Sequence, residues 1–393
     1  MGLKLPFSRN TPANNPANPE RLTLTEADLH DFARGAAFLG TGGGGDPYIG
    51  RLMAQAAIRE YGHPQIIHPS ELADDATVAF IAMLGAPTVL NEKAASGEDI
   101  DLAIQRLTQR IGQPIDALMP AEIGGVNSTL PIVAAARLGL PLLNADGMGR
   151  AFPEIQMVVM NFEGLSATPF VIVDEHLNST IVETADASTA ESFVRTLAVH
   201  MGLSCIVAGY PMTGADVKRA TIHDTLTEAV NIGRAIEAGR RTGDAAGALV
   251  QYLSASKIYG HGRELFDGKI VDLRRETTGG FSIGHCKINS IENPSRTLDL
   301  NFQNENLAAK EGETVLAIVP DLITVIDRET AEPIPTEALR YGQRVKVIAA
   351  AAPKLLRTEA ALKFIHPRCF GLDEDYTPIE SLPMPKSGTG PEN

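Results

Sequence analysis

The sequence predicts an α/β protein: an N-terminal α/β domain with a mostly parallel sheet, followed by a C-terminal β-rich domain of barrel or sandwich-like form. From residue 25 to about residue 241, continuous apolar runs alternate with longer amphipathic stretches, as in a sheet whose parallel strands are joined by helices. After about residue 260, runs rich in β-branched residues follow one another, which favours strands. The 393 residues also exceed the usual size of one domain.

The expected domain boundaries follow from these changes of pattern. Residues 23–242 form the α/β domain with its glycine-rich loop, and residues 243–376 form the β-rich domain. The segments outside them, residues 1–22 and 377–393, are rich in Pro, Gly, Ser and Asn. Such segments bury too little apolar surface to fold, so we expect two disordered tails.

Local signals place the first two helices. Thr25 and Asp28 form an approximate capping box at the start of a helix that continues to Phe38. Asp46 suits the N-cap of a second helix, and Pro47 suits its first turn. The two helices are therefore expected on either side of a glycine-rich loop.

The strands and later helices follow from apolar runs and amphipathic spacing. Residues 77–84 form a continuous apolar run that ends at Gly85, as expected of a strand buried on both faces. The other elements predicted for the first domain are helices over 100–111, 128–138, 187–201 and 215–240 and strands over 117–119, 141–145, 156–161, 169–173 and 204–208. In the second domain we expect a turn at 267–269 and strands over 314–319, 322–326 and 344–348.

Composition narrows the class of protein. The net charge of −14 repels nucleic acid and anionic membranes, and no apolar run approaches the roughly 20 residues that span a bilayer. Three widely separated cysteines fit reduced thiols, and the start of the chain lacks the apolar core of a secretory signal. We expect a cytoplasmic protein that acts on a small molecule. We also expect a homo-oligomer, although apolar helices such as 215–240 could pack either within the domain or between subunits.

The glycine-rich loop is the sharpest local feature. It contains GxGxxG, but a helix rather than a strand precedes it, and it lacks the Lys and Ser/Thr of a Walker loop. NAD and ATP are therefore excluded. The consecutive glycines Gly42, Gly43, Gly44 and Gly45 allow backbone N–H groups to converge on a ligand at a helix N-terminus. The alternative is a tight turn between packed helices, and Asp46 could either cap the helix or take part in the chemistry.

Polar loops follow the predicted strands. If these strands are parallel, the loops and the glycine-rich loop meet in a crevice beyond the carboxyl ends of the strands. The polar residues expected there are Glu122, Asn127, Asp146, Arg150 and Glu154. Such a set offers a carboxylate as general base, amide donors for developing charge and an arginine for a substrate carboxylate. Each residue also has a structural interpretation: Asn127 could cap a helix, Asp146 could stabilise a turn, and Arg150 could pair with Glu154.

The second domain contributes fewer candidates. In the amide- and carboxylate-rich run at 301–306, strand alternation places Asn304 on one side and Glu305 on the other. The run is either a polar rim facing the crevice or an edge strand facing water. His285 and Cys286 are adjacent and would point to opposite faces of a strand, so they are poor joint ligands for one metal. No metal-binding motif is present, and the metal ligands stay unknown.

Several motifs occur together in one order and resemble the S-methyl thiohydantoin desulfurase-like family. They are GTGGGGDP at 40–47, EIGGVN at 122–127, DGMGRAFPE at 146–154, FQNEN at 302–306, VPDLI at 319–323 and LRYGQRV at 339–345. The resemblance extends from about residue 24 to 376. It implies the two-domain fold and, for some members, hydrolytic removal of sulfur from a thiohydantoin ring.

The resemblance also implies a chemical role for the candidate residues. Water would attack the ring carbon that bears sulfur, and Glu122 or Asp146 would remove its proton. Backbone amides of the glycine-rich loop and Asn127 would either stabilise charge or hold the ring's carbonyl, and Arg150 would bind a propionate arm. No cofactor is certain, and a divalent metal held by carboxylates is an open variant. The alternative is a non-catalytic protein that binds a small anion or metabolite, or a subunit of a hydantoinase-type assembly.

Overall fold

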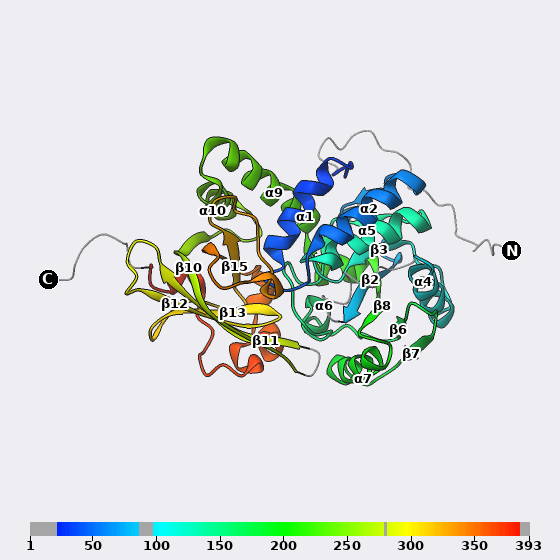
Figure 1. The fold of residues 1–393 in the computed structure, drawn as a ribbon. Coiled ribbons are helices and arrows are strands. Elements are labelled where there is room, and N and C mark those ends of the chain that lie inside the picture. Colours follow the sequence, from blue (N-terminus) through cyan, green and yellow to red (C-terminus); the bar gives the residue numbers. More distant parts are fainter. Residues whose placement is uncertain (1–21, 86–96, 279–280, 386–393) are drawn as a thin grey trace.

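Two sheets organise the protein. The computed structural model describes residues 22–85, 97–278 and 281–385. Figure 1 shows one sheet with its helices in the N-terminal half and the second sheet beside it in the C-terminal half. No helix in the described part of the chain is long and apolar enough to cross a membrane.

The first sheet has seven strands in the order β1-β4-β3-β2-β8-β6-β7. Their bounds are β1 (Ile66–Ile67), β4 (Leu142–Leu143), β3 (Ala117–Pro120), β2 (Thr77–Gly85), β8 (Ser204–Thr213), β6 (Phe170–Val173) and β7 (Ser179–Val182). The first four strands are parallel to one another. Strand β8 is antiparallel to its two neighbours, β2 and β6, and β7 is antiparallel to β6. Five of the seven strands therefore run in one direction, which confirms the mostly parallel α/β domain.

Helices cover both faces of this sheet, and β2 shows why. Its residues Ala79 and Ile81 pack into the core under α1, α2 and α5, whereas Val78 and Phe80 pack into the opposite core with α7. Burial on both faces accounts for the unbroken apolar run in β2. The helices are α1 (Asp28–Leu39), α2 (Pro47–Tyr61), α4 (Glu98–Ile111), α5 (Val126–Leu138), α6 (Val159–Phe162), α7 (Ala187–His200), α8 (Gly214–Ala220), α9 (Thr225–Thr242), α10 (Ala245–Ala255) and α11 (Glu359–Ile365).

The second sheet is antiparallel throughout, in the order β14-β13-β12-β11-β10-β16-β15. Its strands are β10 (Gly262–Thr278), β11 (Phe281–Ser290), β12 (Thr297–Gln303), β13 (Glu305–Glu311), β14 (Thr314–Ile318), β15 (Leu322–Asp327) and β16 (Arg344–Ala350). The sheet curls into a half-barrel: the Asn306 amide of β13 donates to the Ile323 carbonyl of β15 at 2.9 Å, although these strands lie near opposite ends of the order. The β-rich second domain is thus confirmed.

Three predicted elements were wrong. Residues 156–161 lead into the short helix α6 rather than forming a strand, because short apolar runs do not distinguish the two. The helix predicted over 215–240 is interrupted by β9 (Ile222–His223), which pairs with β5 (Ala145–Asp146). The turn predicted at 267–269 lies inside β10, where Gly268 allows close approach of a neighbouring strand, since a Cβ there would lie 2.4 Å from the Asn289 carbonyl oxygen.

The first part of the predicted C-terminal tail contacts the second domain. Ile379 is fully buried, and its N–H donates to Asp321 Oδ2 at 2.7 Å. Residues 377–385 therefore pack on the second domain rather than forming a tail. Apart from residue 22, the predicted N-terminal tail lies outside the described residues, as does the end of the chain from residue 386.

Candidate active site

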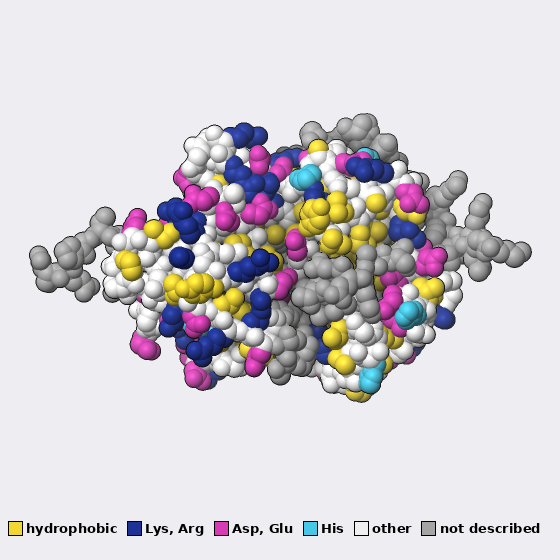
Figure 2. Space-filling view, in the orientation of Figure 1, with side chains coloured by type: hydrophobic (Ala, Val, Ile, Leu, Met, Phe, Trp, Pro, Cys, Tyr) yellow, Lys and Arg dark blue, Asp and Glu magenta, His cyan; other side chains and the backbone are white. Residues whose placement is uncertain are grey.

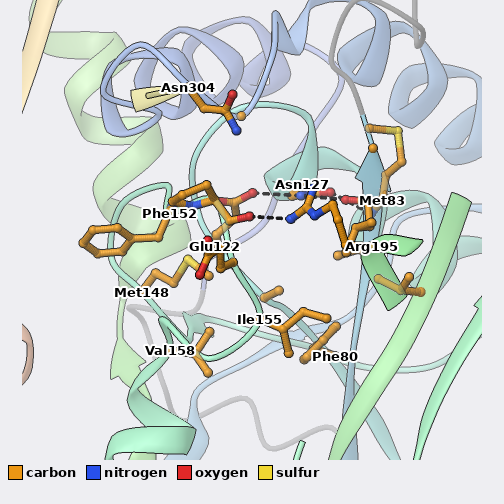
Figure 3. A pocket seen from close by; sticks show the side chains of 18 of the residues that line it. Phe80, Met83, Glu122, Asn127, Met148, Phe152, Ile155, Val158, Arg195 and Asn304 are labelled. Carbon is orange, nitrogen blue, oxygen red and sulfur yellow. Dashed lines mark hydrogen bonds between the residues drawn. The ribbon is translucent and has the colours of Figure 1, made fainter. Parts of the chain in front are cut away.

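A pocket opens at the carboxyl ends of β2 and β3, where the loop after β3 meets the turn between β12 and β13 (Figure 3). It holds about 760 Å³ of empty space, part of it open to solvent. The residues that line it are Gly44, Phe80, Ala82, Met83, Leu84, Gly85, Ala121, Glu122, Asn127, Met148, Phe152, Pro153, Glu154, Ile155, Val158, Phe170, Arg195, Val207, Asn304 and Glu305. The wall is mostly apolar, with a few carboxyl, amide and guanidinium groups.

Glu122 places a carboxyl group in this pocket directly after β3. Its side chain is buried, Asn127 Nδ2 donates to Oε1 at 2.8 Å, and the Phe152 N–H donates to Oε2 at 3.2 Å. Burial raises the pKa of Glu122 to about 8, although these two hydrogen bonds act in the opposite direction. The group is therefore fixed in orientation and able to change protonation state near neutral pH.

Asn127 positions Glu122 from the first turn of α5. Its Oδ1 accepts from the Met83 N–H at 2.8 Å, and its Nδ2 donates to the Met83 carbonyl at 3.1 Å as well as to Glu122. Both amide hydrogens are therefore engaged. The side chain does not cap α5, so the capping interpretation is wrong, and we expect Asn127 to orient Glu122 rather than to stabilise charge on a substrate.

Asp146 is fully buried behind the loops and does not line the pocket. Its Oδ2 accepts from the N–H groups of Ile123, Met148 and Gly149 at 2.9, 3.0 and 2.7 Å. Burial raises the pKa of Asp146 to about 7, against the effect of these donors. The carboxyl group thus ties the loop after β3 to its own loop, which supports the structural interpretation of this residue.

Arg150 is also fully buried, and it joins the two halves of the chain. It donates to the carbonyls of Pro320 and Asp321 at 2.8 and 3.0 Å and to Thr41 Oγ1 at 2.8 Å. A further bond reaches the Ala151 carbonyl at 3.0 Å. Burial lowers the pKa of Arg150 to about 10, while nearby carboxylates oppose the change. With its donors used in this way and no position on the pocket wall, Arg150 is poorly placed to bind a substrate.

The glycine-rich loop contributes one of its glycines to the pocket. Gly44 lines the wall, while the Thr41 and Gly42 carbonyls accept from Asn306 N–H and Thr336 N–H, both at 2.7 Å. The loop therefore packs against the second sheet. Gly43 and Gly45, with Asp46, line a different cavity on the other side of the loop.

Asp46 performs the capping role that the sequence predicted for it. Its carboxylate accepts from the Tyr48 N–H at 2.9 Å at the start of α2. The N-terminus of α2 is thus occupied by a side chain of the protein itself. This arrangement supports the structural interpretation of Asp46.

Asn304 and Glu305 reach the pocket from the C-terminal half. Asn304 has a positive φ of 58° and forms the turn between β12 and β13, so both residues line the wall rather than pointing to opposite sides of one strand. Glu305 was not predicted as a site residue, because strand alternation assumed no turn at this position. The dense polar run around it was the available signal.

Arg195 is the other residue that the sequence did not reveal. It lies on α7, where Nε donates to Glu191 Oε1 at 2.7 Å and Nη2 donates to the Pro153 carbonyl at 2.8 Å. Its Nη1 makes no hydrogen bond within the described residues, and the side chain lines the pocket beside Glu154. Burial and the nearby Glu191 raise the pKa of Glu154. Nothing local distinguishes Arg195 from an ordinary helix arginine.

The remaining candidates lie elsewhere. His285 Nε2 contacts Asp299 Oδ1 at 2.9 Å, and Cys286 is buried with its pKa raised to about 12 by burial. Neither lines the pocket. Among the residues that the structure describes, no three His, Cys, Asp or Glu side chains are grouped to hold a metal ion.

Comparisons with known proteins agree with this architecture. A crystal structure of a protein from Chromobacterium violaceum is similar over 91% of this chain and 100% of that chain, with a TM-score of 0.76 and 24% sequence identity, which supports the fold. The chain matches no curated protein. The S-Me-THD-like N-terminal domain matches residues 27–184, and the S-Me-THD-like C-terminal domain matches residues 185–379. The chain therefore belongs to the S-Me-THD-like, or S-methyl thiohydantoin desulfurase-like, family.

Proposed function

We propose that this protein is a hydrolase that acts on a thiohydantoin or a hydantoin-like cyclic amide and releases a thiol or sulfide. The observation that carries the proposal is the buried Glu122 carboxyl group, held by Asn127 and Phe152 in a largely apolar pocket. With a pKa of about 8, Glu122 can accept a proton from water and return it near neutral pH. The family's name provides independent support for the type of substrate.

Glu122 can act as the base in this reaction and can return its proton to the leaving group. For an S-methyl thiohydantoin, a bond forms between the water oxygen and the ring carbon while the C=N double bond opens. The C–S bond then breaks, and the proton that Glu122 removed from water passes to the departing methanethiolate. The products are methanethiol and the hydantoin. The ring nitrogen also gains a proton during addition, which Glu122 cannot supply while it is accepting one.

The structure favours Glu122 over Asp146 for this role. A general base must come within hydrogen-bond reach of the water that it activates. Glu122 lines the pocket, whereas Asp146 is buried behind it with three backbone donors on one oxygen. Asp146 therefore stabilises the loop that carries the site.

The walls of the pocket suit a flat ring with a charged arm. Phe80, Ile155 and Val158 form an apolar region on the side opposite Asn304 (Figure 3), where a heterocycle and a methylthio group would be desolvated. Arg195 also lines the pocket, and its Nη1 makes no hydrogen bond within the described residues. In this proposal a substrate carboxylate pairs with Arg195 rather than with Arg150.

Release of thiol from purified protein tests the proposal. We expect turnover of S-methyl thiohydantoin or thiohydantoin propionates, and a fall in kcat of roughly 10²–10⁴-fold in Glu122→Gln. Glu228→Gln is the matched control, because burial also raises the pKa of Glu228, which bonds Tyr252 and Ser256 away from the pocket. Unchanged kcat in Glu122→Gln would contradict the role of Glu122.

The same experiment separates catalysis from binding alone. A non-catalytic protein would bind cyclic amides, and both the wild type and Glu122→Gln would be stabilised by them in a thermal-shift assay. Absence of thiol release from the wild type, with and without added divalent metal, would then rule out the proposed hydrolase.

A further inference from the structure

Besides Glu122 and Glu154, a third carboxyl group lies in the same pocket, and the mechanism above does not use it. Glu305 begins β13 and lines the pocket together with Glu122. Its side chain is 2% exposed, and its Oε2 is buried without a hydrogen-bond partner among the described residues. A buried polar atom without a partner costs stability, so this position is explained better by a function than by packing.

Gly43 leaves the space that Glu305 occupies. A Cβ on Gly43 would lie 1.9 Å from Glu305 Oε1, and the two next-nearest atoms also belong to Glu305. Gly43 does not have a positive φ, so its backbone conformation does not itself require glycine. A larger residue at position 43 would therefore have to displace the side chain of Glu305.

Hydrogen bonds fix this arrangement on both sides. The Thr41 carbonyl accepts from the Asn306 N–H at 2.7 Å, directly after Glu305. The Gly42 carbonyl accepts from the Thr336 N–H at 2.7 Å, and the Thr336 hydroxyl donates to the Asn304 carbonyl at 2.8 Å, so the loop is tied to the residue before Glu305 as well. Asn304 Oδ1 accepts from the Ser282 N–H at 2.8 Å, which anchors the turn to β11. The carboxyl group is thus positioned by backbone bonds, while its own Oε2 stays free.

The environment of Glu305 favours its neutral form. Burial and the nearby Glu122 raise the pKa of Glu305 well above its ordinary value, and the Arg150 guanidinium opposes this only in part. Two carboxyl groups with different environments in one pocket can divide the roles of acid and base. In its neutral form Glu305 can donate a proton, whereas Glu122 in its ionised form can accept one.

We propose that Glu305 is the general acid of this site, a neutral carboxylic acid that protonates the ring nitrogen while Glu122 removes a proton from water. This inference rests on the proposed hydrolase function. As the tetrahedral intermediate collapses, the Glu305 carboxylate takes the proton of the new hydroxyl group and the C=O bond forms. Glu122 gives its proton to the departing thiolate, so both groups return to their starting states.

Kinetics of Glu305→Gln test this assignment. The variant keeps the size and polarity of the side chain but cannot transfer a proton, so we expect kcat to fall roughly 10²–10⁴-fold with little change in KM. In the wild type, kcat/KM should have a rising limb with pH as the base form of the carboxyl pair appears and a falling limb as its acid form is lost, both limbs belonging to the interacting pair. The falling limb should be absent in Glu305→Gln and present in Glu228→Gln.

Two further measurements address structure and protonation. Gly43→Ala must displace the Glu305 carboxyl group, so it should lower kcat in the wild-type background and have little added effect in Glu305→Gln. In infrared spectra at pH 7, Glu122 and Asp146 also contribute protonated carboxylic acid bands. The Glu305→Gln variant should therefore lack one such band that the wild type shows, and that band should be retained in Glu228→Gln. An ionised Glu305 in these spectra would overturn the assignment.

The outcomes separate this inference from the proposed function. Loss of activity in Glu122→Gln with wild-type kcat and pH profile in Glu305→Gln would overturn the role of Glu305 and leave the hydrolase in place. A wild type that hydrolyses no cyclic amide would overturn both.

Discussion

The two arginines near the pocket differ in how many of their donors the protein already uses. Arg150 makes four hydrogen bonds to protein atoms and is fully buried, whereas Arg195 makes two and keeps Nη1 free on the pocket wall. A guanidinium group recognises a carboxylate through the donors that remain. Arg150, which belongs to a recognisable motif, therefore joins the two halves of the chain. Arg195, which belongs to none, is the arginine that the proposed function assigns to the substrate carboxylate.

Substitution of Arg195 should affect binding more than chemistry. We expect Arg195→Gln to raise KM roughly 10–100-fold for substrates with a carboxylate arm, because a hydrogen bond to a charged group contributes about 1.5–3 kcal/mol. Substrates that lack the arm should show a much smaller change, and kcat should be little affected. Equal increases in KM for both substrates would indicate that Arg195 only supports Pro153 and Glu191.

The sequence predicted several of the residues that line the pocket, and these residues lie within recognisable motifs. Glu122, Asn127, Glu154, Asn304 and one glycine of the loop do line one pocket, as the order of strands and loops indicated. Which partner each donor or acceptor finds was not predictable, because that depends on tertiary contacts. The Asn127 side chain, for example, bonds Met83, which lies 44 positions away in the chain.

At the scale of elements, three loops pack against one another to form the site. The Gly44 carbonyl accepts from the Val126 N–H at 2.9 Å, and the Gly125 N–H donates to the Ala36 carbonyl at 3.0 Å. A Cβ on Gly125 would lie 2.1 Å from the Gly44 carbonyl oxygen. Glycine at these positions thus allows two backbone segments to approach closely and also allows a positive φ.

Gly125→Ala should therefore separate the glycine-rich loop from α5. Its φ of 58° and ψ of −147° strain any larger residue, and the clash with Gly44 adds to this strain. We expect a loss of unfolding free energy larger than the roughly 1 kcal/mol typical of a point mutation, together with reduced turnover.

Gly139→Ala is the control: its φ is also positive, at 65°, but no atom lies within 4 Å of the added Cβ. Equal destabilisation of the two variants in urea would show that the contact with Gly44 contributes nothing.

The elements that the sequence predicted correctly were those with strong local signals. The long buried strand β2 and the capped helix α2 are confirmed. The turn at Asn304 was missed because no glycine marks it, and the break between α8 and α9 was missed because β9 is held by pairing with the distant β5. Such tertiary pairing overrides local helical pattern.

At the scale of the whole molecule, the pocket depends on both halves of the chain. Glu122 comes from the first sheet's loops and Glu305 from the second sheet. The first sheet also contains strands from both family matches. Strand β8 lies within the residues matched by the C-terminal domain, but it pairs with β2. Figure 2 shows acidic and basic side chains interspersed over the visible face.

Burial of these carboxyl groups should make stability depend on pH. The pKa of Glu122 rises from 4.5 to about 8 and that of Asp146 from 3.8 to about 7, so between these values the folded protein keeps protons that the unfolded chain has lost. Stability should therefore fall as pH rises from about 4.5 to 8, by up to about 1.4 kcal/mol per pH unit for each group. His223, whose pKa burial lowers, acts in the opposite direction around its ordinary pKa.

Urea unfolding of the wild type and Glu122→Gln at pH 5 and pH 8 measures this effect. The variant removes one of the titrating groups, so its free energy of unfolding should fall less between the two pH values. Parallel curves for the two proteins would show that the pKa of Glu122 is the same in the folded and unfolded states.

The most direct test of the account is a crystal structure of the Glu122→Gln variant with an S-methyl thiohydantoin propionate bound. We expect the ring to lie in the pocket with its sulfur-bearing carbon facing position 122, its nitrogen within hydrogen-bond reach of Glu305 and its carboxylate on Arg195. A ring bound outside this pocket, or in it with the sulfur-bearing carbon turned away from position 122, would contradict the proposed mechanism.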